Sequence, residues 1–135
     1  MRVFREVDTT ERIDAAAQAV EWGYPRAIPD DEASRSTWVS YGDDALLWYE
    51  SAEFFKPNAL ALHGCSRPGA RGRLGNPREM IAIEIIAELQ GATRLYSLPG
   101  FPGGTSKIPR KAMRRYLRSR GWTNVEFGSY KDLGG

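Results

Sequence analysis

The sequence predicts a mixed α/β (α+β) fold with a central mixed sheet of about six strands and three main helices. Segments rich in β-branched and aromatic residues alternate with segments that have the 3.6-residue apolar period of helices. A helical segment at residues 77–90 separates strand-like segments at 58–63 and 93–98, which is the crossover that parallel strands require. The 135 residues suffice for one domain with its own core, so we expect a single domain over residues 1–135.

The first half of the chain predicts four strands and one helix. Strands are expected at residues 1–7, 36–41, 45–51 and 58–64, and an amphipathic helix at residues 9–22. Asp8 and Glu11 have the spacing of a capping box, in which Asp8 accepts a hydrogen bond from the Glu11 amide. Pro25 and Pro29 interrupt residues 23–36, so this segment is expected to be a loop with at most a short helix, which could help form a binding cleft.

The second half predicts two helices and two further strands. The helix at 77–90 begins with the favoured N-cap Asn76, Pro77 at its first position and Glu79 of a capping box. Its apolar residues predict a helix buried across the sheet; they are Met80, Ile81, Ile83, Ile85, Ile86 and Leu89. A strand at 93–99, a helix at 107–120 that ends at Gly121, and one last strand at 123–130 follow.

Charge is distributed unevenly along the chain. Residues 1–62 hold six Lys/Arg and twelve Asp/Glu, whereas residues 63–120 hold twelve Lys/Arg and three Glu, which suggests that the second half binds an anion. Oppositely charged faces of one domain would explain the same counts. The single cysteine, the absence of an apolar leader in residues 1–8 and the absence of a long apolar run predict a cytoplasmic protein outside the membrane.

The segment at residues 67–76 predicts a phosphate site. Three arginines and three glycines precede the capped helix, so free backbone N–H groups, positive charge and the positive end of a helix dipole coincide. A basic surface loop that only turns a corner is the alternative, since glycine-rich loops are common.

This layout resembles the GNAT superfamily, whose members transfer an acyl group from coenzyme A to an amine. The resemblance covers nearly the whole chain in element order and is sharpest at residues 67–77, although the loop is one residue shorter than the family pattern. It implies acetyl-coenzyme A as the acyl-donor substrate, bound at residues 67–78. The implied pyrophosphate-binding residues are Arg67, Arg71, Gly72, Arg73, Leu74, Gly75 and Asn76.

Two further positions are similar to catalytic features of this superfamily. Residues 111–122 resemble its fourth helix, in which a tyrosine donates a proton to the departing thiolate; Leu117 aligns with that tyrosine and Tyr116 precedes it. Tyr116 is therefore a candidate proton donor, with core packing as the alternative. The bulged strand of the family corresponds to residues 61–68, where Gly64 could make the bulge. His63 is the candidate general base, and a structural histidine is the alternative.

These observations favour an N-acyltransferase that moves an acetyl or similar acyl group from acyl-coenzyme A to an amine of unknown identity. One alternative is a catalytically degenerate GNAT-like binding or assembly protein. Another is a nucleic-acid-binding domain that uses the helix at 107–120, where seven Lys/Arg and no acid occur. A homodimer remains open. One histidine and one cysteine make a poor metal-ligand set, so no metal site is expected. Asp30, Asp31 and Glu32 could attract a cationic acceptor.

Overall fold

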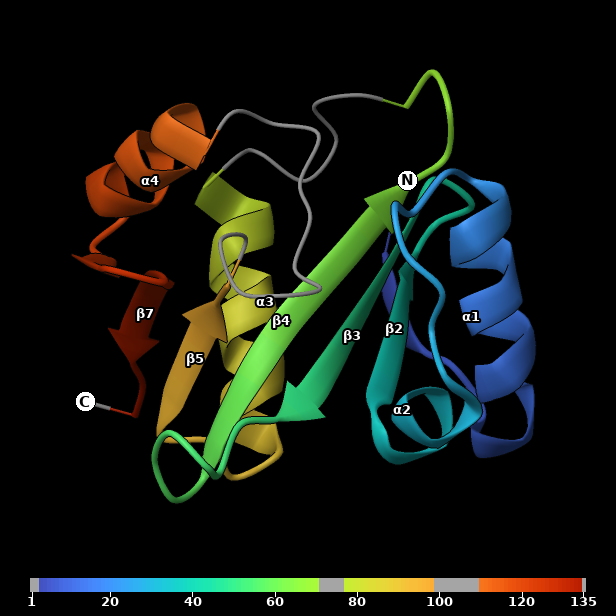
Figure 1. Ribbon diagram of the computed structural model, residues 1–135, viewed down its shortest axis with the longest axis horizontal. Helices are drawn as coiled ribbons and strands as arrows, with labels where there is room; N and C mark the ends of the chain where they lie inside the picture. Colours follow the sequence, from blue (N-terminus) through green and yellow to red (C-terminus); the bar gives the residue numbers. More distant parts are fainter. Residues whose placement is uncertain (1–2, 71–76, 99–109, 135) are drawn as a thin grey trace. The chain divides into compact units, whose positions relative to one another are not determined.

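A computed structural model describes residues 3–70, 77–98 and 110–134 (Figure 1). Within these ranges, seven strands are hydrogen-bonded in the order β1-β2-β3-β4-β5-β7-β6. The strands are β1 (Phe4–Glu6), β2 (Thr37–Tyr41), β3 (Ala45–Ser51), β4 (Ala59–Ser66), β5 (Arg94–Ser97), β6 (Thr123–Val125) and β7 (Gly128–Asp132). The helices are η1 (Thr9–Glu11, a 3-10 turn), α1 (Arg12–Glu21), α2 (Asp30–Arg35), α3 (Pro77–Leu89) and α4 (Arg110–Ser119). The predicted mixed fold is confirmed.

The chain forms two compact units. The first takes its residues from Met1–Glu50 and His63–Asn76, and the second from Ser51–Leu62 and Pro77–Gly135.

In the first unit, helices α1 and α2 pack on the strands β2 and β3 (Figure 1). β2 and β3 form the expected antiparallel hairpin, in which Trp38 pairs with Trp48. These two indole rings are stacked with centroids 4.4 Å apart, and both are fully buried. The small residues Ala16 and Ala19 of α1 belong to the same core, so the helix approaches the indoles closely. The two stacked indoles are therefore closely packed, and Trp48 supports the side chain of His63.

The N-terminal cap of this helical region differs from the sequence expectation. The side chain of Asp8 accepts hydrogen bonds from the amide and the hydroxyl of Thr10, each at 3.0 Å. The amide of Glu11 bonds to the backbone carbonyl of Asp8 instead. The predicted capping box is therefore wrong, because η1 tightens the first turn and brings Thr10, two residues on, within reach of the cap.

In the second unit, the expected crossover is confirmed. β4 and β5 pair in parallel, with Leu60 opposite Leu95, and α3 connects them. α3 is also tied to β7, because Lys131 lies 2.6 Å from Glu84. Helix α4 ends at Ser119, close to the predicted end, and Gly121 just beyond it has a φ of +87° that is unfavourable for a residue with a Cβ atom.

Two expectations for this unit are wrong. The segment at 123–130 was expected to hold one strand, but β6 and β7 form an antiparallel hairpin around residues 126–127. Helix α3 was expected to be buried on most sides, whereas Ile81, Ile85 and Leu89 are exposed. Only the face with Met80, Ile83 and Ala87 is buried. A helix that covers one face of a sheet buries one stripe, whatever the residues on its outer face.

Candidate functional site

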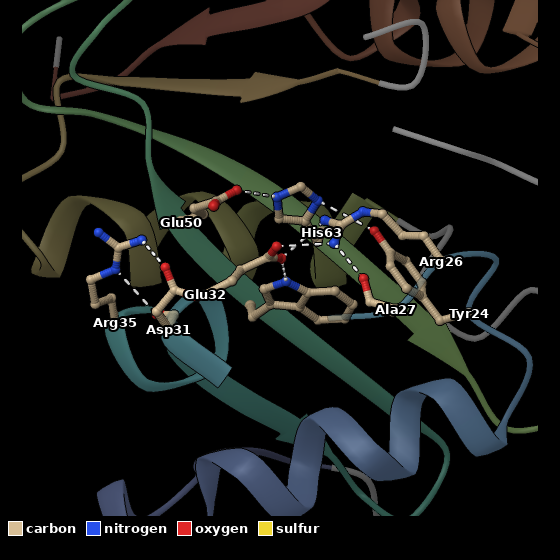
Figure 2. Close-up of polar contacts among 9 residues, drawn as sticks. Tyr24, Arg26, Ala27, Asp31, Glu32, Arg35, Glu50 and His63 are labelled. Atoms are coloured by element: carbon tan, nitrogen blue, oxygen red, sulfur yellow. Dashed lines mark hydrogen bonds and ion pairs between the residues drawn. The ribbon is translucent and has the colours of Figure 1, made fainter. Parts of the chain in front are cut away.

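His63 lies on β4, between a carboxylate and a phenol of the same unit. Its Nε2 is 3.0 Å from Oε1 of Glu50, and its Nδ1 is 3.5 Å from the hydroxyl of Tyr24 (Figure 2). The side chain of His63 is 14% exposed and that of Glu50 is 38% exposed. The imidazole ring also stacks on Trp48, with centroids 5.4 Å apart. Both ring nitrogens therefore face oxygen atoms, while one side of the ring is held against an indole.

Strand geometry explains this placement. Trp48 and Glu50 are two residues apart on β3, so their side chains leave the same face of the sheet. Gly64, next to His63 on β4, permits close approach to β3, since a Cβ atom there would lie 3.0 Å from the Leu47 side chain. The bulge that Gly64 could make stays a prediction; in the structure this glycine lies against the neighbouring strand.

A second carboxylate, Glu32 of α2, lies beside this group, and Arg26 balances its negative charge. Arg26 donates two hydrogen bonds of 2.9 Å to its two oxygens (Figure 2). The indole Nε1 of Trp48 donates a third, of 3.0 Å. Burial alone would raise the pKa of Glu32, but these hydrogen bonds and the charge of Arg26 outweigh burial and lower it. Glu32 therefore stays ionised, and it holds the indole on which His63 stacks.

Tyr24 completes the group. Burial is the main cause that raises the pKa of its hydroxyl above the ordinary value, although Arg26, which lies over its ring at 5.4 Å, acts in the opposite direction. The hydroxyl therefore remains protonated and can donate to Nδ1 of His63. At 3.5 Å this contact is long, so Nδ1 is held less firmly than Nε2.

The arrangement suits proton transfer better than metal binding. Ligand atoms of Glu32, Glu50 and His63 all lie within 4.8 Å of one another. Both oxygens of Glu32 already accept hydrogen bonds, and the guanidinium of Arg26 would repel a cation. An imidazole between a carboxylate and a phenol can instead take up and release a proton.

Other sequence candidates of the first unit have structural partners. The thiol of Cys65 donates to the carbonyl of Ala19 at 3.4 Å. Arg67 pairs with the buried Asp44 at 2.7 Å, so its charge is balanced within the unit. Two acidic residues of α2 also have partners, since Asp31 pairs with Arg35 and Glu32 with Arg26. The attraction of a cationic acceptor by Asp30, Asp31 and Glu32 stays a prediction, although Glu32 is already bound by Arg26. The predicted binding residues Arg71, Gly72, Arg73, Leu74, Gly75 and Asn76 lie outside the described residues.

Tyr116 belongs to the second unit. It is half-buried on α4, and Arg120 lies over its ring at 5.7 Å, while the neighbouring Leu117 is the buried residue of that turn.

The basic side chains of α4 have two kinds of surroundings. Lys111, Arg115 and Arg118 are exposed, whereas Arg114 donates hydrogen bonds to the carbonyls of Val125 and Gly128. Among the described helices, none is both long and apolar enough to cross a bilayer.

Sequence reasoning named His63 but missed its contacts with Tyr24, Trp48 and Glu50. It also missed the hydrogen bonds that Glu32 accepts from Arg26 and Trp48. One signal was available. The two-residue period of the predicted strand at 45–51 places Trp48 and Glu50 on one face. Nothing in the spacing of Tyr24 and Arg26 indicated that their loop returns to the same place.

Comparison with known proteins identifies the fold. No protein-family model and no curated protein sequence matches the chain. Solved structures do match. The chain is similar to yncA from Salmonella typhimurium with its cofactor acetyl-CoA, at 12% identity and a TM-score of 0.64 over 100% of this chain and 95% of that one.

Two other structures give the same result. The acetyltransferase of GNAT family from Streptococcus pneumoniae is 9% identical, with a TM-score of 0.65 over 99% and 100% of the two chains. YhhK from E. coli bound to coenzyme A is 14% identical, with a TM-score of 0.57 over 98% of each chain. The resemblance drawn from the sequence is thus confirmed at the level of architecture, and the chain has the GNAT fold.

Proposed function

We propose that the protein is an N-acyltransferase that moves an acetyl or similar acyl group from acyl-coenzyme A to an amine, with His63 as the general base. The GNAT fold over the whole chain supports the reaction class, and yncA and YhhK with this fold bind acetyl-CoA or CoA. The observation that carries the proposal is the position of His63, on β4 with Nε2 on Glu50 and Nδ1 toward Tyr24.

In the proposed step, Nε2–H of His63 donates to Glu50, so Nδ1 carries the lone pair. The amine nitrogen takes the place of the Tyr24 hydroxyl at Nδ1, whose contact of 3.5 Å is long. It attacks the thioester carbonyl carbon and loses its proton to Nδ1. The carbon–sulfur bond then breaks, the electron pair stays on sulfur, and the thiolate takes up a proton. Tyr116 is the candidate donor of that proton. Glu50 is a positioning residue that fixes the tautomer of His63 and stabilises the imidazolium after proton transfer.

The acyl donor is proposed to bind at residues 67–78. This assignment comes from the glycine- and arginine-rich sequence before the helix that begins at Pro77. The partly exposed carboxylate of Glu50 favours an acceptor that arrives as an ammonium ion, because an opposite charge near that carboxylate is stabilising.

The test is thiol release from acetyl-coenzyme A with a panel of primary amines and polyamines. His63→Gln keeps a polar side chain beside Glu50 and is expected to lower kcat by about 10²- to 10⁴-fold, the usual contribution of a general base. The KM for acetyl-coenzyme A should stay unchanged, because His63 is not proposed to bind the donor.

The matched control is Cys65→Ser, two residues along β4, which should retain full activity. Glu50→Gln should lower kcat less than His63→Gln and alter the pH profile, since it removes the partner that fixes the tautomer. Turnover unchanged by His63→Gln would eliminate the assigned base. An absence of thiol release with every amine would contradict the reaction class.

A further inference from the structure

Asp44 is a buried carboxylate that the proposed reaction does not use. It lies in the turn between β2 and β3 and is 5% exposed, whereas its neighbour Asp43 in the same turn is exposed. A carboxylate is buried at acceptable cost only where partners compensate its charge. Oδ1 of Asp44 accepts a hydrogen bond of 2.7 Å from Nη2 of Arg67, the residue that follows β4. Any role of Asp44 in binding is therefore exerted through Arg67.

A second hydrogen bond joins the same two residues. The backbone amide of Arg67 donates to the carbonyl of Asp44, also at 2.7 Å. The end of β4 lies beside the turn between β2 and β3 (Figure 1). Because the main chain and the side chain of Arg67 are both held by Asp44, the direction of the guanidinium is fixed relative to the start of β3.

The chain turns immediately after this point. The amide of Ala70 donates to the carbonyl of Arg67 at 3.0 Å, which closes a β-turn. Pro68 and Gly69 occupy its central positions, and Gly69 has a φ of +87°, so the turn has the features of type II. Ala70 is 4% exposed, so the turn ends against the core. Arg67 thus begins a turn that is held at both ends.

The guanidinium of Arg67 still has N–H groups to offer. Its side chain is 55% exposed, although that of Asp44 is only 7% exposed. A guanidinium carries several N–H groups in one plane, and the side-chain hydrogen bond to Asp44 uses one of them. The fork of N–H groups matches the oxygens of a phosphate. Since Asp44 balances the charge of Arg67, the pair offers a phosphate a fixed orientation more than an excess of charge.

We propose that Asp44 is a positioning residue for the acyl donor, and that it orients the guanidinium of Arg67 toward a phosphate oxygen of the coenzyme A thioester. This inference rests on the proposed function, in which Arg67 belongs to the donor site. Without the carboxylate of Asp44, the long side chain of Arg67 samples several rotamers, and donor binding has to order it. The cost of ordering one such side chain corresponds to an affinity loss of about two- to tenfold.

Calorimetric titration of coenzyme A tests this role through a double-mutant cycle. Asp44→Asn keeps the size of the side chain and removes its charge, and it should weaken binding about two- to tenfold. Arg67→Gln should weaken binding about 10- to 100-fold, because a charged donor is lost. In the Arg67→Gln background, Asp44→Asn should have no further effect, since it acts through Arg67. The matched control Asp43→Asn, in the same turn, should bind as the wild type does.

Two kinetic measurements separate positioning from a loss of structure. At saturating amine, Asp44→Asn should raise the KM for acetyl-coenzyme A and leave kcat unchanged, because the chemical step does not involve Arg67. With S-acetylpantetheine, which has the same thioester and no phosphate, the wild type and Asp44→Asn should have equal kcat/KM. A general loss of structure would lower the activity with both donors.

Three outcomes would overturn the positioning role. They are coenzyme A binding that Asp44→Asn leaves unchanged, equal effects of Asp44→Asn in the wild-type and Arg67→Gln backgrounds, and equal losses with the two donors. If Asp44→Asn does not fold, Arg67→Lys keeps a counter-charge for Asp44 but lacks the planar fork, and wild-type affinity in that variant would overturn the proposal. A wild type that does not bind coenzyme A would contradict the proposed function as well.

Discussion

Two arginine–carboxylate pairs, one in each unit, share their chemistry and differ in their surroundings. In the first unit Arg26 donates two hydrogen bonds of 2.9 Å to Glu32, whose side chain is 10% exposed. In the second unit Arg94 donates hydrogen bonds of 2.7 and 3.3 Å to Asp132, whose side chain is 61% exposed. The local geometry is bidentate in both, so the difference in burial should decide what each pair contributes.

The neighbours of the two pairs point to different roles. Glu32 also holds Trp48, the residue on which His63 stacks, so the buried pair supports the candidate site. The pair of Arg94 and Asp132 fastens β5 to β7, and Arg94 lies 3.9 Å from the centre of the Tyr130 ring. Removal of a buried partner leaves the other charge without compensation, whereas water replaces an exposed partner at little cost.

The largest expected effect is the loss of Glu32. Glu32→Gln should lower the free energy of unfolding by about 3 kcal/mol, because Arg26 keeps its charge in a partly buried position without a counter-ion. The matched control Asp132→Asn should cost less than about 1 kcal/mol. Urea unfolding monitored by tryptophan fluorescence measures both. Equal losses would show that burial does not distinguish the two pairs.

The same contrast should appear in the pH dependence of stability. The pKa of Glu32 is lowered in the folded protein, so its stabilising contribution is present above its ordinary pKa of 4.5 and is lost as pH falls through the lower folded value. The stability difference between wild type and Glu32→Gln should therefore be largest near pH 7 and shrink below about pH 4.5. A difference that stays constant from pH 7 to pH 3 would contradict the assignment.

The smallest expected effect concerns the exposed pair and its aromatic neighbour. Tyr130→Leu removes the ring beneath Arg94 and should cost about 0.5–1 kcal/mol. Asp132→Asn should become nearly neutral in 1 M NaCl, where the screening length is about 3 Å. Thermal unfolding at low and high salt measures both changes. If Asp132→Asn lowers the free energy of unfolding by more than about 2 kcal/mol at both salt concentrations, the exposed pair of Arg94 and Asp132 contributes as much as the buried pair of Arg26 and Glu32.

The parts of the fold that depend on local sequence periodicity could be predicted from the sequence. The hairpin of β2 and β3, the parallel pair β4 and β5, and the end of α4 just before Gly121 all follow from residue pattern and turn chemistry. The burial of α3 did not follow, since apolar residues on all sides of a helix do not reveal which side meets the sheet. The β6–β7 hairpin was missed because its turn is only two residues long and its strands are short.

The candidate site was predictable only in part. His63 was found because it is the single histidine, and its strand was correctly placed. Its partners come from segments 13 to 39 residues away in the sequence, so only the tertiary fold brings them together. The structure also changed the interpretation of the acidic residues near position 31. Glu32 is bound by Arg26, and Glu50, which the sequence analysis did not select, is the carboxylate on His63.

The most direct test of the proposed function is calorimetric titration of acetyl-coenzyme A into the wild type and a Gly72→Glu variant, with a short DNA duplex as the competing ligand class. We expect one site with micromolar affinity in the wild type, no binding by the variant, and only weak, salt-sensitive binding of DNA. An absence of coenzyme binding, or equal binding by the two proteins, would contradict the assignment of this chain as an acyl-coenzyme A-dependent transferase with its donor site at residues 67–78.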